Sequence, residues 1–229
     1  MRDGRSEMTQ TVVVTGAAGA LGKVVAKALT QAGWDVIGVD KAEVAADGLT
    51  LALGGVSLNE PAEVAQAVEK IRAKAPRVAG LVNIAGGFRW ETIADGDVAT
   101  WDLMYALNVK TALVTTRALL PLLDAPAAIV NVGANAATRA DMGMGAYAAS
   151  KAGVSRLTEA LAQELKDRGV RVNAVLPSII DTAANRADMA DAEFDRWVKP
   201  EQLASVIAFL LSESASAVTG ALLPVVGRV

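Results

Sequence analysis

Tyr147 and Lys151 are the two residues whose types and spacing indicate acid–base chemistry in this chain. They stand four positions apart, so on a helix their side chains lie one above the other on a single face. A free phenol has a pKa of about 10, but a nearby cation favours the phenolate and lowers that value. The pair can therefore give or take a proton, although a surface tyrosine one turn from a surface lysine is also a common arrangement.

The composition leaves few other groups for such chemistry. The 229 residues include no Cys and no His, which excludes thiolate nucleophiles, disulfides, thiolate metal sites and Ser-His-Asp machinery. A net charge of −3 and a pI near 5.1 argue against a nucleic-acid surface. There is no apolar run of the length of about 20 residues that spans a membrane, and no apolar segment typical of a secretory signal. We expect a globular, cytoplasmic protein without metal, nucleic acid or membrane partners, in which residues 1–8 form a flexible tail.

The segment Thr11–Gly22 (TVVVTGAAGALG) predicts a strand, a glycine-rich turn and a helix. Val12–Val14 are typical of a buried strand, and apolar positions recur at helical spacing after Ala20. Such a turn lets a pyrophosphate approach the backbone at the positive end of a helix, whereas a glycine triplet alone also suits a tight turn without ligand. The residues expected to hold a dinucleotide here are Gly16, Ala18, Gly19, Ala20, Leu21 and Gly22.

Asp40 ends the second expected strand, Trp34–Asp40. It follows the glycine turn at about the spacing at which a carboxylate meets the adenosine ribose. A carboxylate there accepts hydrogen bonds from the 2′-hydroxyl and repels a 2′-phosphate, which favours NAD over NADP. Lys41 follows directly and softens this preference, so NADP stays open, as does the alternative of a solvated turn aspartate.

Strands and helices alternate through the rest of the chain. Further strands are expected at Leu49–Leu53, Val78–Ile84, Ala127–Gly133, Val170–Leu176 and Ala221–Val226, and helices at Pro61–Ala75, Thr100–Leu120, Tyr147–Lys166 and from Pro200. The alternation predicts an α/β fold with a single Rossmann-type, doubly wound parallel sheet of about seven strands and helices on both faces. We expect one domain over residues 1–229. The acid-rich segment 181–198 is expected to form a substrate lid, its carboxylates on a solvated helix face rather than around a metal.

Taken in order, these motifs resemble the short-chain dehydrogenase/reductase family over nearly the whole chain. The matching pieces are the glycine turn, Asp40, NIAG at Asn83–Gly86, Asn108, YAASK at Tyr147–Lys151, RVNAVLPS at Arg171–Ser178, and Thr182. The resemblance implies an NAD(P)-dependent oxidoreductase in which Tyr147 exchanges a proton, Lys151 holds the nicotinamide ribose and lowers the tyrosine pKa, and Asn108 supports a water relay. It also implies cofactor contacts at Asn83, Ala85, Gly86, Tyr147, Lys151, Pro177, Ile179 and Thr182.

Ala134 is the most informative departure from the family pattern, because the catalytic serine falls on this position. A hydroxyl there normally donates a hydrogen bond to the substrate carbonyl oxygen. Either the neighbouring Asn135 replaces it, or the substrate does not need that contact. In addition, the family's usual aspartate is not evident around Gly55–Ser57, and the second glycine of the turn is replaced by Ala20, with Gly19 one position earlier.

Within the family, the pattern is most similar to the dihydropteridine reductase branch, which works with Tyr and Lys but without the serine. Phe88, Trp90 and Trp197 either line a pocket for a flat heterocycle or belong to the core. Asn108 departs from that branch. The sequence therefore predicts hydride transfer between NAD(P) and a small carbonyl, alcohol or quinonoid substrate. Its alternatives are dihydropteridine reductase proper and a catalytically silent dinucleotide-binding sensor.

The resemblance also implies self-association as a homodimer or homotetramer. In the family, the helices corresponding to Thr100–Leu120 and Tyr147–Lys166 pair in a four-helix contact. Both segments are rich in Ala, Leu and Val. Their apolar faces can equally be used against the sheet.

Overall fold

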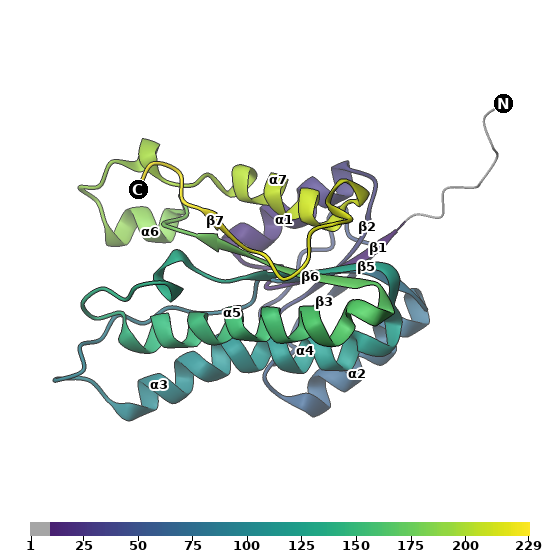
Figure 1. Cartoon of the computed structure of the whole chain (residues 1–229), viewed down its shortest axis with the longest axis horizontal. Coiled ribbons are helices and arrows are strands. Elements are labelled where there is room, and N and C mark those ends of the chain that lie inside the picture. The colour runs from purple at the N-terminus through teal and green to yellow at the C-terminus, as the bar shows by residue number, and fades with distance from the viewer. Residues whose placement is uncertain (1–9) are drawn as a thin grey trace.

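A central sheet of parallel strands lies between two layers of helices (Figure 1) in the computed structural model, which describes residues 10–229. The strand order is β3-β2-β1-β4-β5-β6-β7. The strands are β1 Thr11–Thr15, β2 Asp35–Val39, β3 Leu51–Leu53, β4 Val78–Asn83, β5 Leu123–Val132, β6 Val170–Pro177 and β7 Leu222–Val225. The expected fold class is thus confirmed, while the tail predicted for residues 1–8 falls outside the described residues.

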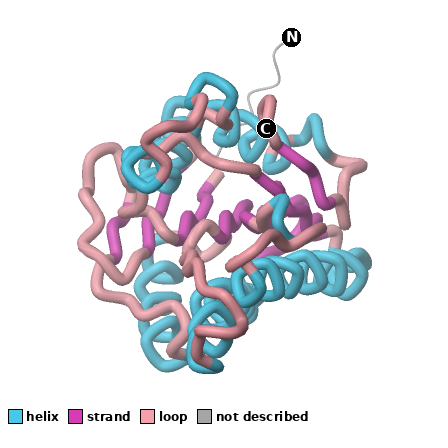
Figure 2. Tube along the Cα trace, turned by 90° about the vertical axis from the view of Figure 1, so that its left-hand side faces the viewer, coloured by secondary structure: helices cyan, strands magenta, loops and turns pink. Residues whose placement is uncertain are grey.

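The helices cover both faces of the sheet, as the end-on view of the strands shows (Figure 2). One layer consists of α1 Ala20–Gln31 and α7 Pro200–Leu211, and the other of α2 Pro61–Lys74, α4 Thr111–Leu119 and α5 Gly145–Leu165. A proline stands at the start of α2 and of α7, where its fixed φ favours the first turn and its missing N–H costs nothing. Among the described residues, no helix is long and apolar enough to cross a membrane.

Successive side chains of a strand point to opposite faces of the sheet, where they pack in two separate hydrophobic cores. Val13 packs with the α2, α4 and α5 layer, whereas Val12 and Val14 pack with α1 and α7. This explains why the strand reads as an uninterrupted run of valines, since both of its faces are buried.

The helix expected over Thr100–Leu120 is divided into three parts. It consists of α3 Val98–Met104, a π-helical stretch Tyr105–Lys110 and α4, and the π-helical stretch carries Asn108. A π-helical insertion adds one residue to a turn without disturbing the general apolar pattern, so periodicity does not reveal it. Likewise β5 begins at Leu123, four residues before the predicted start at Ala127. The prediction began after Pro126, because proline rarely lies inside a strand.

The segment predicted as a lid contains the short helix α6 Ala183–Asp188 and a 3₁₀ turn. At its base, Arg186 and Lys199 both donate to the carboxylate of Asp181, and these bonds hold the pKa of Asp181 well below its usual range. Farther along, Asp195 pairs with Arg228 at 2.9 Å. These carboxylates are therefore used in ion pairs, and no cluster suited to a metal ion occurs within residues 10–229.

Candidate active site

A cavity of about 490 Å³ opens at the carboxyl ends of β1 to β4. Ligands of open α/β sheets bind at this edge, where the strand order reverses about β1. The cavity is lined by Gly16, Ala18, Gly19, Ala20, Leu21, Gly22, Asp40, Lys41, Ala42, Ser57, Leu58, Asn59, Ile84, Ala85, Gly86, Leu107 and Thr111. The structure therefore brings together all the glycine-turn residues that the sequence indicated, along with Asp40, Ala85 and Gly86.

The glycine turn has a backbone path that side chains would block. Gly16 has a φ of +69°, and a Cβ there would lie 2.8 Å from the backbone nitrogen of Ala85. A Cβ on Gly22 would lie 2.0 Å from the carbonyl oxygen of Gly16. Gly19 caps α1 without any side-chain hydrogen bond, so the first N–H groups of the helix are left for an anion. This cradle fits the pyrophosphate of a dinucleotide.

Thr15 joins the glycine turn to the segment that follows β4. Its hydroxyl oxygen accepts hydrogen bonds from the backbone nitrogens of Ile84 at 3.1 Å and Ala85 at 3.3 Å. The two sides of the cavity are thereby fixed to each other at the end of β1.

Asp40 lies at the end of β2 with its carboxylate held in place by backbone groups. Oδ2 accepts from the Ala18 nitrogen at 3.0 Å and Oδ1 from the Ala42 nitrogen at 2.9 Å. A carboxylate has about four acceptor positions, so it can also accept hydrogen bonds from two ribose hydroxyls. The acceptor groups at this end of the cavity fit the hydroxyls of an adenosine ribose.

Lys151 lies deep in the protein, with 5% of its surface exposed. Its Nζ donates to the carbonyl oxygen of Val132, at the end of β5, at 2.8 Å. Burial lowers the pKa of Lys151 to about 8, because the charged ammonium loses water.

Tyr147 has the opposite shift, which corrects an expectation drawn from the family. Burial raises the pKa of Tyr147 to about 12, and the loss of water around the phenol is its only identified cause. The expected lowering by Lys151 is therefore wrong for this structure, in which the lysine is bound to Val132 and itself tends to lose its proton. The phenol is protonated at neutral pH, as a proton donor must be.

Asn108 is buried and connects three parts of the site. Its Oδ1 accepts from the Gly87 nitrogen at 3.0 Å, and its Nδ2 donates to the Gly87 carbonyl oxygen at 3.0 Å. The same Nδ2 donates to Ser150 Oγ at 3.0 Å, and Ser150 Oγ donates to the Tyr147 carbonyl oxygen at 2.7 Å. We call these four residues the Asn108 network. Both amide protons of Asn108 are used within it.

The residues suggested for substrate contact separate into two groups. Phe88 is 55% exposed, and its ring meets Tyr147 edge to face at 4.9 Å between centroids. Ala134 is buried, and Asn135 directly follows it in a short turn. Trp197, in contrast, is only 4% exposed and packs against Phe194, so it belongs to the core of the lid segment and does not line the cavity.

Asn83 is likewise not part of the cavity wall. It is buried at the end of β4, and its Nδ2 donates to Thr116 Oγ1 at 3.0 Å and to Asn131 Oδ1 at 2.8 Å. Asn131 in turn donates to Thr158 Oγ1 at 2.9 Å. The strand turns the Asn83 side chain toward α4 and α5, where its amide nitrogen is bonded within the protein.

Three other predicted cofactor residues follow or end β6. They are Pro177, Ile179 and Thr182, none of which lines the cavity. Thr182 accepts a hydrogen bond from the Asn185 nitrogen and thereby caps α6.

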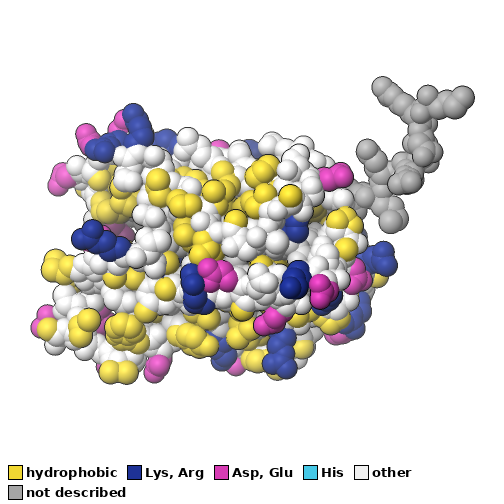
Figure 3. Space-filling model, in the orientation of Figure 1, with side chains coloured by type: hydrophobic (Ala, Val, Ile, Leu, Met, Phe, Trp, Pro, Cys, Tyr) yellow, Lys and Arg dark blue, Asp and Glu magenta, His cyan; other side chains and the backbone are white. Residues whose placement is uncertain are grey.

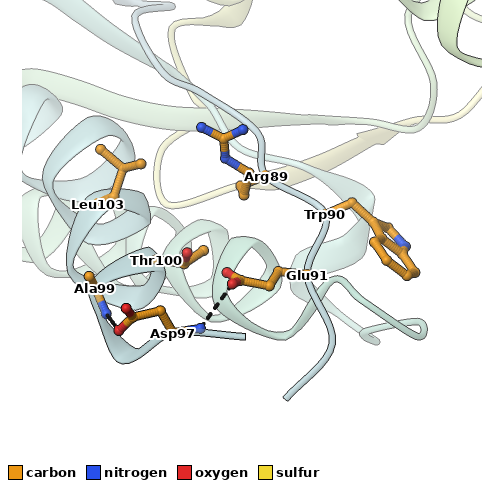
Figure 4. A pocket seen from close by; sticks show the side chains of 7 residues that line it. All are labelled: Arg89, Trp90, Glu91, Asp97, Ala99, Thr100 and Leu103. Carbon is orange, nitrogen blue, oxygen red and sulfur yellow. Dashed lines mark hydrogen bonds between the residues drawn. The ribbon is translucent and has the colours of Figure 1, made fainter. Parts of the chain in front are cut away.

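A second hollow, of about 450 Å³, lies between the segment 89–91, which directly follows Phe88, and the start of α3. Glu91 extends toward Asp97 at the start of α3, and Trp90 extends to the other side of the segment (Figure 4). Glu91 accepts from the Asp97 nitrogen at 2.9 Å. On the face seen in Figure 3, hydrophobic side chains gather near α3, which exposes Val98, Trp101 and Leu103.

Several lining residues were missed from the sequence. Ser57–Asn59 follow β3, so their place at the carboxyl edge beside β2 is the signal that could have found them. Leu107 and Thr111 lie in the π-helical stretch and at the start of α4, close to Asn108. Periodicity does not reveal the π-helical stretch, so it could not place these two residues at the cavity wall.

Comparison with known proteins finds a matching family and related structures. A family model described as short chain dehydrogenase matches residues 10–193. The 3-oxoacyl-[acyl-carrier-protein] reductase FabG of Thermotoga maritima is 31% identical, over 94% of this chain and 95% of its own length. Galactitol 2-dehydrogenase (L-tagatose-forming) of Cereibacter sphaeroides is 35% identical, over 93% of this chain and 92% of its own length. The structure of 3-ketoacyl-(acyl-carrier-protein) reductase from Brucella melitensis complexed with NADH has a TM-score of 0.85 at 29% identity, covering 96% of this chain and 98% of that one.

Proposed function

The chain belongs to the short-chain dehydrogenase family of NAD(P)-dependent oxidoreductases, and we propose that it reduces a small carbonyl or quinonoid substrate, or oxidises the matching alcohol, with NAD. The observation that carries the proposal is a half-buried, protonated Tyr147 four positions from a buried Lys151, at the sheet edge that holds the glycine-turn cavity. The relatives are named as a 3-oxoacyl reductase and a galactitol dehydrogenase, so ketones and alcohols both occur among their named substrates.

The bound cofactor supplies the hydride, and the residues of the chain supply its position and the proton. Tyr147 gives the proton of its hydroxyl to the substrate oxygen as the carbonyl carbon gains a hydride. Lys151 stabilises the phenolate that this proton transfer leaves behind, provided that its amine is charged. Water or bulk solvent then returns a proton to Tyr147 for the next turnover.

NAD is the proposed cofactor on account of Asp40. Its carboxylate is held at the cavity wall by two backbone N–H groups and would repel a 2′-phosphate. The relative complexed with NADH supports the same choice. Lys41 also lines the cavity and is the residue that could admit NADP.

Asn135 is the proposed replacement for the serine that Ala134 lacks. No hydrogen bond within residues 10–229 uses its side-chain amide, which is therefore free to donate to a substrate oxygen. Comparing Asn135→Ala with Ala134→Ser tests this role. For a carbonyl substrate, we expect Asn135→Ala to lose turnover. Ala134→Ser restores a hydroxyl at the position where the family has one.

A dihydropterin is the second candidate substrate. Phe88 presents an exposed ring beside Tyr147, and Ala134 presents no hydroxyl, which together favour a flat substrate that needs no hydrogen bond from that position. A silent dinucleotide sensor is the third candidate, and the intact arrangement of Tyr147, Lys151 and Asn108 argues against it.

The experiment is NADH oxidation with a quinonoid dihydropterin and, in parallel, with ketones, aldehydes and quinones. Wild type, Tyr147→Phe and the control Tyr105→Phe are compared. Turnover that depends on Tyr147 supports the oxidoreductase, and the substrate that reacts identifies the branch. NADH binding without any turnover would instead support the sensor.

We further propose a cytoplasmic homodimer or homotetramer. Val98, Trp101 and Tyr105 are exposed hydrophobic side chains on α3 and the π-helical stretch, as a subunit interface requires. Sedimentation that shows only a monomer at micromolar concentration would contradict this.

A further inference from the structure

We propose that Ser150 is a positioning residue for Tyr147, and that it acts through the Asn108 network. The proposal rests on the proposed function, since Tyr147 must be the proton donor for its position to matter. Ser150 is buried, and its hydroxyl has a partner on each side. Its hydroxyl is occupied on both sides by protein groups, which leaves it a role in positioning rather than in contact with substrate.

The hydrogen bonds of the network have a defined direction. Ser150 has one hydroxyl proton, which goes to the carbonyl oxygen of Tyr147 at 2.7 Å. Its oxygen accepts from Asn108 Nδ2 at 3.0 Å, and that amide is fixed by Gly87. Ser150 is therefore the single residue through which Asn108 holds the backbone of Tyr147.

The start of α5 requires such support. The helix begins at Gly145, and its N-cap Met144 makes no side-chain hydrogen bond to the first turn. Gly143, just before it, has a φ of +75°. Uncapped helix ends fray more readily than capped ones, and Tyr147 lies within this first turn. The bond from Ser150 fixes the carbonyl group of the catalytic residue where a cap is missing.

The network also reaches Tyr147 by a second path. Gly87, held at both backbone groups by Asn108, precedes Phe88, and the Phe88 ring packs edge to face on the Tyr147 ring. Asn108 thus controls both the backbone of Tyr147, through Ser150, and the ring of Tyr147, through Gly87 and Phe88. These contacts connect the loop after β4 to the first turn of α5.

Loss of the Ser150 hydroxyl breaks the path to the backbone of Tyr147 and leaves the path through Gly87 and Phe88 in place. We expect Ser150→Ala to lower kcat by about tenfold, because small displacements of a catalytic group are costly. The KM for NADH should stay unchanged, since the cavity wall does not include Ser150. Ser150→Thr keeps a hydroxyl that can reach the same carbonyl and should restore most of the kcat.

Ser155→Ala is the matched control. Ser155 is also buried in α5 and donates only within the helix, at 3.3 Å to the carbonyl oxygen of Lys151. Lys151 lies beyond the uncapped first turn and its Nζ is held independently by Val132, so its position does not depend on Ser155. A general loss of helix stability would appear in both alanine variants. A loss specific to the Asn108 network would appear only in Ser150→Ala.

A readout independent of turnover comes from the two tyrosines of the chain, Tyr105 and Tyr147. Protein labelled with 3-fluorotyrosine should give two ¹⁹F resonances, and Tyr105→Phe assigns the one from Tyr147. In Ser150→Ala we expect this resonance to shift or broaden, and in Ser150→Thr and Ser155→Ala to stay close to its wild-type position.

The outcomes separate the two proposals. If wild type turns over no substrate while the resonance still responds only to Ser150→Ala, the proposed function fails and the positioning role of Ser150 stands. If wild type is active but Ser150→Ala retains its kcat and its resonance, or if Ser155→Ala loses as much, the positioning role is overturned.

Discussion

The ring of Phe88 meets the ring of Tyr147 edge to face, with centroids 4.9 Å apart and planes at 84°. Aromatic pairs favour this geometry. The contact joins the loop after β4 to α5 and contributes apolar surface beside the phenol. Burial of this kind raises the pKa of Tyr147 to about 12, so the resting site holds its proton ready for a substrate.

Replacement of Tyr147 by Phe should abolish most turnover. General acid catalysis contributes at least about 100-fold, and the variant keeps the ring that packs on Phe88. NADH oxidation checks the rate, and quenching of tryptophan fluorescence checks that NADH still binds. Tyr105→Phe, at an exposed position, should turn over like wild type. Equal rates for wild type and Tyr147→Phe would contradict the role of the phenol.

The pH dependence should be set by Lys151 rather than by Tyr147. The reduction needs a protonated phenol and a charged ammonium, and burial lowers the pKa of Lys151 to about 8 while that of Tyr147 lies near 12. We expect kcat/KM for reduction, which reports on the free enzyme, to fall as pH rises through about 8. A profile that stays flat past pH 10 would point to a permanently charged lysine.

Lys151→Met should give a protein that is more stable but inactive. Lowering the lysine pKa from 10.5 to about 8 costs on the order of 3 kcal/mol of unfolding free energy at pH 7. The lost bond from the charged amine to Val132 offsets about 2 kcal/mol, which leaves a gain of about 1 kcal/mol. Denaturant unfolding at pH 7 measures the difference.

The sign of this effect can be checked through pH. Between about 8 and 10.5 the unfolded chain binds a proton at Lys151 that the folded chain has released. The stability contributed at this site in wild type therefore rises with pH through that window, and the advantage of Lys151→Met should shrink. An advantage that grows with pH would show that the lysine keeps its charge when folded.

Asp40→Asn should shift the cofactor preference toward NADP. The amide retains an acceptor for the backbone N–H groups of Ala18 or Ala42 but no longer repels a 2′-phosphate. We expect the ratio of kcat/KM for NADH over NADPH to fall by about tenfold or more. The exposed Asp47→Asn carries the same change of charge and should leave the ratio as it is.

The sequence was most informative where local pattern and sheet topology act together. Gly16–Gly22 and Asp40 follow adjacent parallel strands, so their meeting at one edge could be predicted before any packing was known. Asn83 and Trp197 could not be placed, because the direction of a side chain depends on strand phase and on neighbours distant in the chain. The pKa of Tyr147 depends on burial, which the motif does not encode.

The buried amide of Asn83, which was expected at the cofactor, has a consequence for folding fidelity. Asn83 lies opposite Asn131 where β4 pairs with β5, in a sheet whose apolar faces would tolerate a slip of two residues. Such a slip would set Asn83 opposite Ile129 or Gly133 and Asn131 opposite Leu81 or Ala85. The bond from Asn83 Nδ2 to Asn131 Oδ1 would be lost, at a cost of about 1–3 kcal/mol for each group left unpaired. The asparagine pair thus selects the native register, because it penalises misaligned strands that hydrophobic collapse alone would accept.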